Sequence, residues 1–233
     1  RARPPARNIA KPSPSRWPWN SGARRIPAIK GFAGLQIAPV TLENRFVRLV
    51  PFDIDAHAEA LRDMAERSGQ RLATWPYFNP PGDWISVWVK AIRKRAEAGT
   101  LVPFAVLTPE GRFAGMSAYL NPDAVSKNVE IGMTIYAPEF QGGATNPACK
   151  HLLLGHAFGQ GAIRVCFNVD ERNARSRAAV TKLGGVQEGV LRDNRVLPDG
   201  FVRTTVVFSI LAREWPGVKE GLEARLARFE RKD

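Results

Sequence analysis

Three short segments rich in β-forming residues constrain the fold of this sequence more than any other feature. They cover residues 102–107, 113–120 and 129–135, and the turn Pro-Glu-Gly at 109–111 joins the first two. Short strands that follow one another with turn residues between them indicate an antiparallel meander. The middle of the chain is therefore predicted to form a largely antiparallel sheet.

Helical patterns and further strands flank this meander on both sides. Asp55 is a candidate N-cap for a helix over residues 56–67, and Asn146 followed by Pro147 predicts the start of a long central helix. A Pro-Asp-Gly turn at 198–200 joins the last two strands. This alternation predicts an α/β domain. The other expected elements are strands at 46–50, 163–169, 186–196 and 201–211, and helices at 83–92, 174–183 and 218–231.

Composition fits a globular protein and excludes several classes. Of the 233 residues 44% are hydrophobic and 24% are charged, which is enough apolar material for a sizeable core. No run of 18 or more apolar residues and no secretory segment is present, so we expect a cytoplasmic protein that does not span a membrane. Two cysteines and three histidines without metal-ligand spacing predict neither a disulfide scaffold nor a metal site.

The first 38 residues differ from the rest and are predicted to form a basic, proline-rich arm. Residues 1–35 hold eight Lys or Arg, no acidic residue and six of the 18 prolines, so they carry +8 of the net charge of +12. Prolines at this density exclude a regular helix and argue against a transit peptide. Three roles are open for the arm. It is a solvated extension, it attracts nucleic acid, or it docks through Trp17 and Trp19 onto the body or onto a second subunit in a homodimer. We favour docking over nucleic acid.

The loop Gln141-Gly142-Gly143-Ala144-Thr145-Asn146 is the first candidate for a binding site. It lies between a predicted strand and a helix N-terminus, where free backbone N–H groups and the positive end of the helix dipole attract an anion. The loop is neither a Walker loop nor a dinucleotide fingerprint. Taken alone, it indicates a tight turn into a capped helix more often than a binding site.

Several stretches, taken in order, make residues 40–215 similar to the GNAT superfamily of acyl-CoA N-acyltransferases, in its RimJ/RimL-like branch. The most specific block is Asn173-x-x-Ser176 followed by Lys182-Leu183-Gly184. The resemblance implies a GNAT-like mixed, mostly antiparallel seven-stranded sheet flanked by helices, with splayed fourth and fifth strands. It sets the GNAT acetyltransferase domain at residues 39–216 and a C-terminal charged helix at 217–233. Val129-Glu130-Ile131-Gly132, the loop from Gln141 into Lys150, and Glu188-Gly189-Val190-Leu191-Arg192 also match.

The resemblance also implies a site for acetyl-CoA in the gap between those splayed strands. The backbone around Gly142, Gly143, Ala144, Thr145 and Asn146 would bind the pyrophosphate, with Gln141 at the start of the loop. Ala144 and Asn146 occupy positions where the family has small residues, and Ala144 admits the backbone approach if its φ is negative. Asn173 would bind pantetheine or cap the next helix. No metal is implied.

Acetyl transfer requires a base, an oxyanion site and an acid for the leaving thiolate. Glu130 is the predicted base, either directly or through water, although a solvated or salt-bridged glutamate at the end of a strand explains it equally well; Asp170 and Glu171 are alternates. The oxyanion would rest on a backbone N–H near Thr134 or Ile135. The family's usual tyrosine is missing, so Ser176 is the remaining hydroxyl for the thiolate. Cys149 is not expected to form an acyl-enzyme, and His151 and His156 are expected to pack on a helix face or to be exposed to solvent rather than to act in catalysis.

We therefore expect an acetyl-CoA-dependent N-acetyltransferase that acts by direct attack in a ternary complex. The acceptor is a primary amine, either a protein N-terminus or a small molecule, and its identity stays open. Trp75 and Tyr77 are the candidate substrate-binding residues, although a hydrophobic core corner explains them equally well. The alternative is a basic nucleic-acid- or ribosome-associated binding protein with a vestigial acyl-CoA fold, which only the uneven charge supports.

Overall fold

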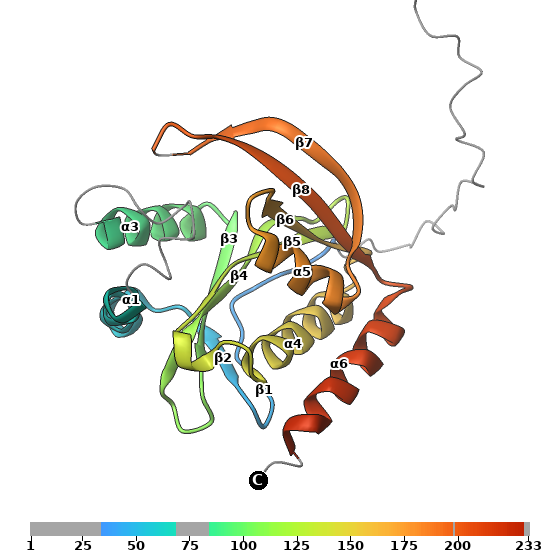
Figure 1. Ribbon diagram of the computed structural model, residues 1–233, viewed down its shortest axis with the longest axis horizontal. Helices are drawn as coiled ribbons and strands as arrows, with labels where there is room; N and C mark the ends of the chain where they lie inside the picture. Colours follow the sequence, from blue (N-terminus) through green and yellow to red (C-terminus); the bar gives the residue numbers. More distant parts are fainter. Residues whose placement is uncertain (1–33, 69–83, 198, 231–233) are drawn as a thin grey trace, which may run out of the picture. The chain divides into compact units, whose positions relative to one another are not determined.

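The computed structural model of the chain describes residues 34–68, 84–197 and 199–230 (Figure 1). The predicted substrate residues Trp75 and Tyr77, and the arm with Trp17 and Trp19, lie outside the described residues. The domain boundaries at residues 38 and 216 stay predictions. Among the described residues, no helix combines the length and apolar character that crossing a membrane requires.

Eight strands form one mixed sheet in the order β1-β2-β3-β4-β5-β6-β8-β7. All neighbours pair antiparallel except β5 and β6, which are parallel. The strands are β1 (Leu42–Glu43), β2 (Arg48–Pro51), β3 (Leu101–Leu107), β4 (Phe113–Asp123), β5 (Asn128–Tyr136), β6 (Arg164–Asp170), β7 (Val186–Val196) and β8 (Val202–Leu211). The predicted class is confirmed. The eighth strand is β1, whose two residues are too few to give a periodic pattern.

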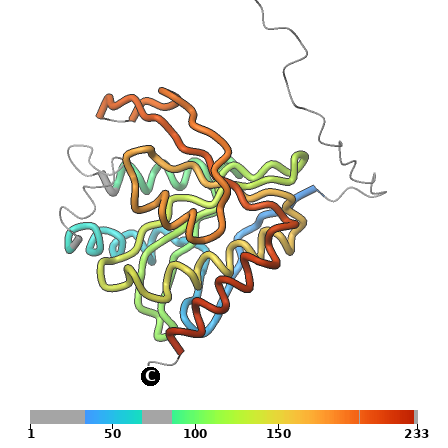
Figure 2. The backbone as a smooth tube through the Cα atoms, turned by 45° about the vertical axis from the view of Figure 1, so that its right-hand side comes forward, coloured from blue at the N-terminus to red at the C-terminus, as the bar shows by residue number. Residues whose placement is uncertain are grey.

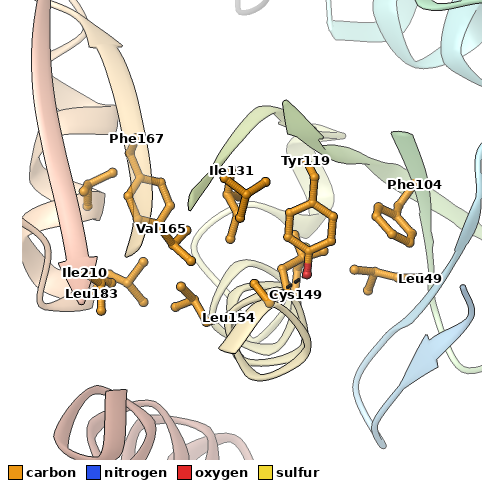
Figure 3. Close-up of a cluster of buried hydrophobic side chains, with 14 of the residues drawn as sticks. Leu49, Phe104, Tyr119, Ile131, Cys149, Leu154, Val165, Phe167, Leu183 and Ile210 are labelled. Carbon is orange, nitrogen blue, oxygen red and sulfur yellow. Dashed lines mark hydrogen bonds between the residues drawn. The ribbon is translucent and has the colours of Figure 1, made fainter. Parts of the chain in front are cut away.

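Helices cover both faces of this sheet, each over its own apolar cluster. The helices are α1 (Ile54–Ser68), α3 (Trp84–Glu97), α4 (Thr145–Gly159), α5 (Ala174–Leu183) and α6 (Trp215–Glu230). The cluster under α1 and α3 includes Leu61, Ile92 and Met116. The larger cluster includes Leu154 of α4 and Leu226 of α6. In Figure 3 side chains from the strands point toward α4, which crosses the middle of that face.

Three helices start earlier than predicted: α1 and α4, whose caps differ from the predicted ones, and α6, which begins at Trp215 instead of residue 218. Asp53, not Asp55, caps α1: its Oδ1 accepts from the N–H of Ala56 at 2.9 Å, while its own N–H donates to His57 Nδ1 at 3.0 Å. The N-cap of α4 is Ala144, and its side chain makes no cap hydrogen bond. Because Asp53 and Asp55 are only two positions apart, the sequence pattern alone does not show which of them caps α1.

Candidate active site

The strands β5 and β6 separate after three residue pairs, and this opening defines the candidate site. The pairs are Asn128–Arg164, Val129–Val165 and Glu130–Cys166. β5 continues to Tyr136 and β6 to Asp170 without further pairing. The predicted splay of these two strands, the fourth and fifth of the expected seven, is therefore confirmed, and Glu130 lies at the point where they part.

A β-bulge in β5 changes which side chains face α4 beyond this point. Gly132 pairs with Ala118 and Ile135 with Met116, so two residues of β5 lie opposite one residue of β4. The extra residue is Met133, whose φ of 49° is unusual for a residue with a side chain. As a result Thr134 turns toward α4, where it contacts Lys150.

The parallel pairing places two helix N-termini at the same edge of the gap. β5 leads through the 141–146 loop into α4, and β6 leads through Asn173 into α5. Since the carboxyl ends of parallel strands lie at one edge of a sheet, both sets of free helical N–H groups lie at the mouth of the opening. This edge is therefore suited to bind an anionic group.

The loop before α4 is closed by hydrogen bonds that leave its backbone available. Gln141 Nε2 donates to Tyr136 O at 2.7 Å, and the Tyr136 hydroxyl donates to Asn146 Oδ1 at 3.4 Å. Gly142 has φ +81°, a conformation that favours glycine. Ala144 has φ −71°, as the backbone approach requires. The first hydrogen bond of the helix runs from Ala148 N to Ala144 O, so the preceding N–H groups lack helical partners.

Asn173 caps α5 as predicted, and this brings Ser176 to the same edge. The N–H of Ser176 donates to Asn173 Oδ1 at 2.9 Å. The Ser176 side chain is partly exposed in the first turn of α5. Within the described residues, no hydrogen bond joins Ser176 to Glu130, which lies one strand away. The structure therefore does not bring the predicted acid and base together: Ser176 lies in the first turn of α5 on the face that carries α4, whereas the neighbours of Glu130, Val129 and Ile131, point to that face and Glu130 points to the other.

Glu130 faces the side of the sheet that carries α3. Its Oε2 accepts from Asn168 Nδ2 of β6 at 2.9 Å, a bond that crosses the opening. Burial raises the pKa of Glu130, and the hydrogen bond with Asn168 together with the charges of Arg195 and Arg95 opposes that rise. A carboxylate with a raised pKa is better matched to take a proton from an amine near neutral pH.

The alternate base Asp170 is instead part of a buried ion cluster. Its Oδ1 accepts from Arg172 Nε at 3.0 Å, and its Oδ2 lies 2.9 Å from Arg172 Nη2 and 3.8 Å from Arg203 Nε. Arg203 also donates from Nη2 to Asn168 O at 3.0 Å, and burial lowers its pKa to about 10. The Asp170 carboxylate is thus engaged at the end of β6, and the geometry favours Glu130.

Lys150 is a buried charged residue that sequence reasoning did not single out. Only 7% of its surface is exposed, and its Nζ donates to Thr134 Oγ1 at 2.6 Å and to Ser117 Oγ at 3.3 Å. The two hydroxyls are 2.7 Å apart. Burial lowers the pKa of Lys150. Its spacing to the buried Leu153 and Leu154, three and four positions on, is the signal that places it on the inner face of α4.

The two cysteines are poor nucleophiles in this structure. Burial raises the pKa of Cys149 inside α4. Burial and the nearby charge of Glu130 raise the pKa of Cys166 to about 11. Because the thiolate is the reactive form, neither residue suits covalent catalysis. Among the described residues, no group of His, Cys, Asp and Glu is arranged to hold a metal ion.

His151 and His156 both contact neighbouring side chains along α4. His151 lies against Trp215, with ring centroids 6.0 Å apart, and its Nε2 is 3.3 Å from Glu223 Oε1. His156 Nδ1 lies 3.2 Å from the Tyr119 hydroxyl, which donates to Leu153 O. Both contacts lie along α4, away from the opening between β5 and β6.

Comparisons with known proteins agree with this architecture. A family model for the acetyltransferase (GNAT) domain matches residues 47–186, more than half of the chain. A protein from T. thermophilus whose solved structure is assigned to the acetyltransferases is 37% identical, with 82% of this chain and 99% of that chain covered and a TM-score of 0.72. A GCN5-related N-acetyltransferase from Brucella melitensis is 26% identical, with coverages of 85% and 90% and a TM-score of 0.75.

A further solved relative is RimJ from Mycobacterium smegmatis, in complex with CoA-disulfide. It is 25% identical, with 80% of this chain and 94% of that chain covered and a TM-score of 0.68. The comparison with curated proteins gave no match. The split sheet, the two helix N-termini at its edge and the family match lead to one conclusion: the chain belongs to the GNAT acetyltransferase family.

Proposed function

We propose that this acetyltransferase uses acetyl-CoA to acetylate a primary amine by direct attack within a ternary complex. The observation that carries the proposal is the opening between β5 and β6, with free N–H groups of α4 and α5 at its edge and Glu130 at its base. The raised pKa values of Cys149 and Cys166 support direct attack over a covalent acyl-enzyme.

Acetyl-CoA fits the residues that border this opening. The backbone from Gly142 to Asn146 would bind the pyrophosphate, since its N–H groups lack helical partners and Gly142 adopts the required positive φ. Asn173 and Ser176, which begin α5, would border the pantetheine and sulfur end. The thioester would then lie against β5 beyond the bulge, near Thr134 and Ile135.

The chemistry follows from this placement. Glu130, directly or through a water molecule, takes a proton from the ammonium group of the acceptor, and the freed nitrogen attacks the thioester carbonyl carbon. A backbone N–H near Thr134 or Ile135 stabilises the oxyanion of the tetrahedral intermediate. As the carbon–sulfur bond breaks, Ser176 donates a proton to the CoA sulfur and regains one from water, while the acylated nitrogen releases its second proton to water. A thiol of pKa near 8.5 leaves readily, so this proton contributes modestly.

The acceptor class and the branch are part of the same proposal. The similarity to RimJ supports the RimJ/RimL-like branch, whose acceptors include protein N-termini and small amines. The predicted cytoplasmic location and the homodimer formed through the arm belong to this proposal as well. A binding protein with a vestigial fold is disfavoured, because the loop before α4 and the cap of α5 keep the geometry that acetyl-CoA needs.

Thermal unfolding with and without acetyl-CoA tests the first step. A ligand at 100 times its Kd stabilises the folded state by about 2.7 kcal/mol, which corresponds to about 5–10 °C for a domain of this size. We expect such a rise with acetyl-CoA and with CoA, and a smaller one with pantetheine, which lacks the pyrophosphate. The absence of any shift at millimolar acetyl-CoA would contradict the proposal.

A further inference from the structure

Polar and charged side chains from four strands share the sheet face that carries Glu130. Residues that pair across strands place their side chains on the same face. Glu130 pairs with Cys166, and Cys166 pairs with Ser209 of β8. Six residues before Ser209, and therefore on the same face, Arg203 pairs with Arg195 of β7. The register alone thus places Arg195 on the face of Glu130.

A second bulge directs this end of β7. Between the pairs Leu191–Thr205 and Arg195–Arg203, β7 has two residues more than β8. Asp193, inside this bulge, has φ 50°. Bulges bend a strand and redirect its side chains, often beside active sites. Figures 1 and 2 show the β7–β8 hairpin curving toward the side of the sheet on which α3 lies.

Arg95 reaches the same place from the last turn of α3. Its Nη2 donates to Thr100 O at 3.2 Å and to Asn121 Oδ1 at 3.5 Å, so neutral groups hold the guanidinium. Asn121 directly follows Leu120, which pairs with Glu130. Arg95 therefore lies close enough to Glu130 and to Arg195 for their charges to act on one another. Arginines from two elements distant in the sequence therefore converge on one carboxylate.

Arg95, Arg195 and Glu130 together carry a net positive charge. Within the described residues, neither Arg95 nor Arg195 forms an ion pair with an acidic side chain. Arg164, on the same face, is already neutralised by Glu188. Two cations and one carboxylate leave one positive charge beside the proposed base. An amine is a cation when it reaches the site, so the positive charge repels it. An acceptor that also carries a negative charge is not repelled in this way.

We infer that Arg95 and Arg195 bind an anionic group of the acceptor, so that the preferred substrate is an amine that also carries a carboxylate or phosphate. This inference rests on the proposed acetyl transfer at Glu130. The guanidinium groups would orient the anionic group by charge-assisted hydrogen bonds while the amine faces Glu130. Both residues bind the acceptor and take no part in proton transfer.

Matched acceptor pairs test the inference. One pair is the C-terminally amidated peptide Ser-Asp-Ala-Tyr and its Ser-Asn-Ala-Tyr counterpart, which differ in one carboxylate. The other is phosphoethanolamine and ethanolamine, which tests phosphate. We expect kcat/KM to be about tenfold to a hundredfold higher for the acidic member of at least one pair, the range of hydrogen bonds to charged groups. The pair that shows the preference identifies the anionic group.

Substitutions identify the residues responsible. Arg95→Gln and Arg195→Gln should each lower the acidic-to-neutral ratio of kcat/KM about tenfold, whereas Arg93→Gln, the same change two residues away on α3, should leave it within about twofold. The ratio cancels any effect of these charges on Glu130 itself. Arg195 is exposed, so its variant should fold even if Arg95→Gln is unstable.

Binding is measured alongside turnover, as the shift in melting temperature that each probe causes in the CoA-saturated protein. We expect stabilisation by the acidic probes in the wild type and its loss in Arg195→Gln. Equal rates and equal stabilisation for the acidic and neutral members would overturn the inference while leaving acetyl transfer intact. Absence of acetyl-CoA binding would instead contradict the proposed function.

Discussion

Replacing Lys150 with methionine tests the most unusual buried contact in this fold. The change keeps an unbranched side chain of similar length and removes Nζ, which donates to Thr134 and Ser117. The two hydroxyls are 2.7 Å apart and remain bonded to each other, so no buried polar atom is left without a partner. Lost hydrogen bonds of about 1.5–3 kcal/mol each are offset by the desolvation cost of a buried ammonium, which is several kcal/mol.

The expected free energy of unfolding at pH 7 is therefore within about 1 kcal/mol of the wild type. The pH dependence gives the sharper result. Burial lowers the pKa of Lys150 in the folded state, so between that value and about 10.4 the unfolded chain binds the additional proton. Wild-type stability should then rise with pH through this window relative to Lys150→Met, by about 1.4 kcal/mol for each unit of pKa difference.

Urea unfolding at pH 7 and pH 9.5 measures both the free energy of unfolding and its change with pH. Thr134→Val is the matched control. That control removes one hydroxyl partner but keeps the buried amine, so it should cost about 1–3 kcal/mol. A loss above about 3 kcal/mol in Lys150→Met at pH 7, or the same difference from wild type at both pH values, would refute this reasoning.

Four further predictions concern the cofactor edge, the chemistry and the arm. Asn173→Ala should weaken acetyl-CoA binding, measured by calorimetric titration. It should also cost about 1 kcal/mol of stability in urea unfolding, because the α5 cap is lost; unchanged affinity would argue against a role of Asn173 in cofactor binding. Gly142→Ala should also weaken binding in the same titration, because φ +81° strains any other residue by about 1 kcal/mol, and tighter binding would be inconsistent with this role. Glu130→Gln and Ser176→Ala should lower kcat with little change in acetyl-CoA affinity, and full turnover of both at saturating substrates would show that the acid and base are misassigned. Removal of residues 1–35 should preserve the domain's fold and acetyl-CoA binding but weaken dimerisation in sedimentation, whereas an unchanged oligomeric state with lost RNA or DNA binding would favour the nucleic-acid role.

The parts of the fold that were predictable from sequence are those fixed by local patterns. The start of α5 at Asn173 follows from capping chemistry, and the meander follows from strand-length segments with turns between them. The family resemblance added the splay of β5 and β6, which no local pattern contains. β1 was not predicted because its two residues are too few to show a periodic pattern.

The features that sequence reasoning missed depend on contacts between distant residues. The bulge at Met133 exists because β4 and β5 pair with different spacing on either side of it, and a strand's own sequence does not specify that. Lys150 became notable only when Thr134 and Ser117 were found beside it. Likewise Arg95 and Arg195, one hundred positions apart, meet only through the sheet register and the curvature of the β7–β8 hairpin.

The most direct test of acetyl transfer at the β5–β6 opening is amine-dependent release of CoA thiol from acetyl-CoA, with the product identified by mass spectrometry. We predict one N-acetylated amine for each thiol released, and a slower rate in Glu130→Gln at unchanged acetyl-CoA affinity. Thiol release that does not depend on an amine would contradict the account. So would the absence of thiol release with every acidic and neutral amine and peptide tested, in protein that is shown to bind acetyl-CoA.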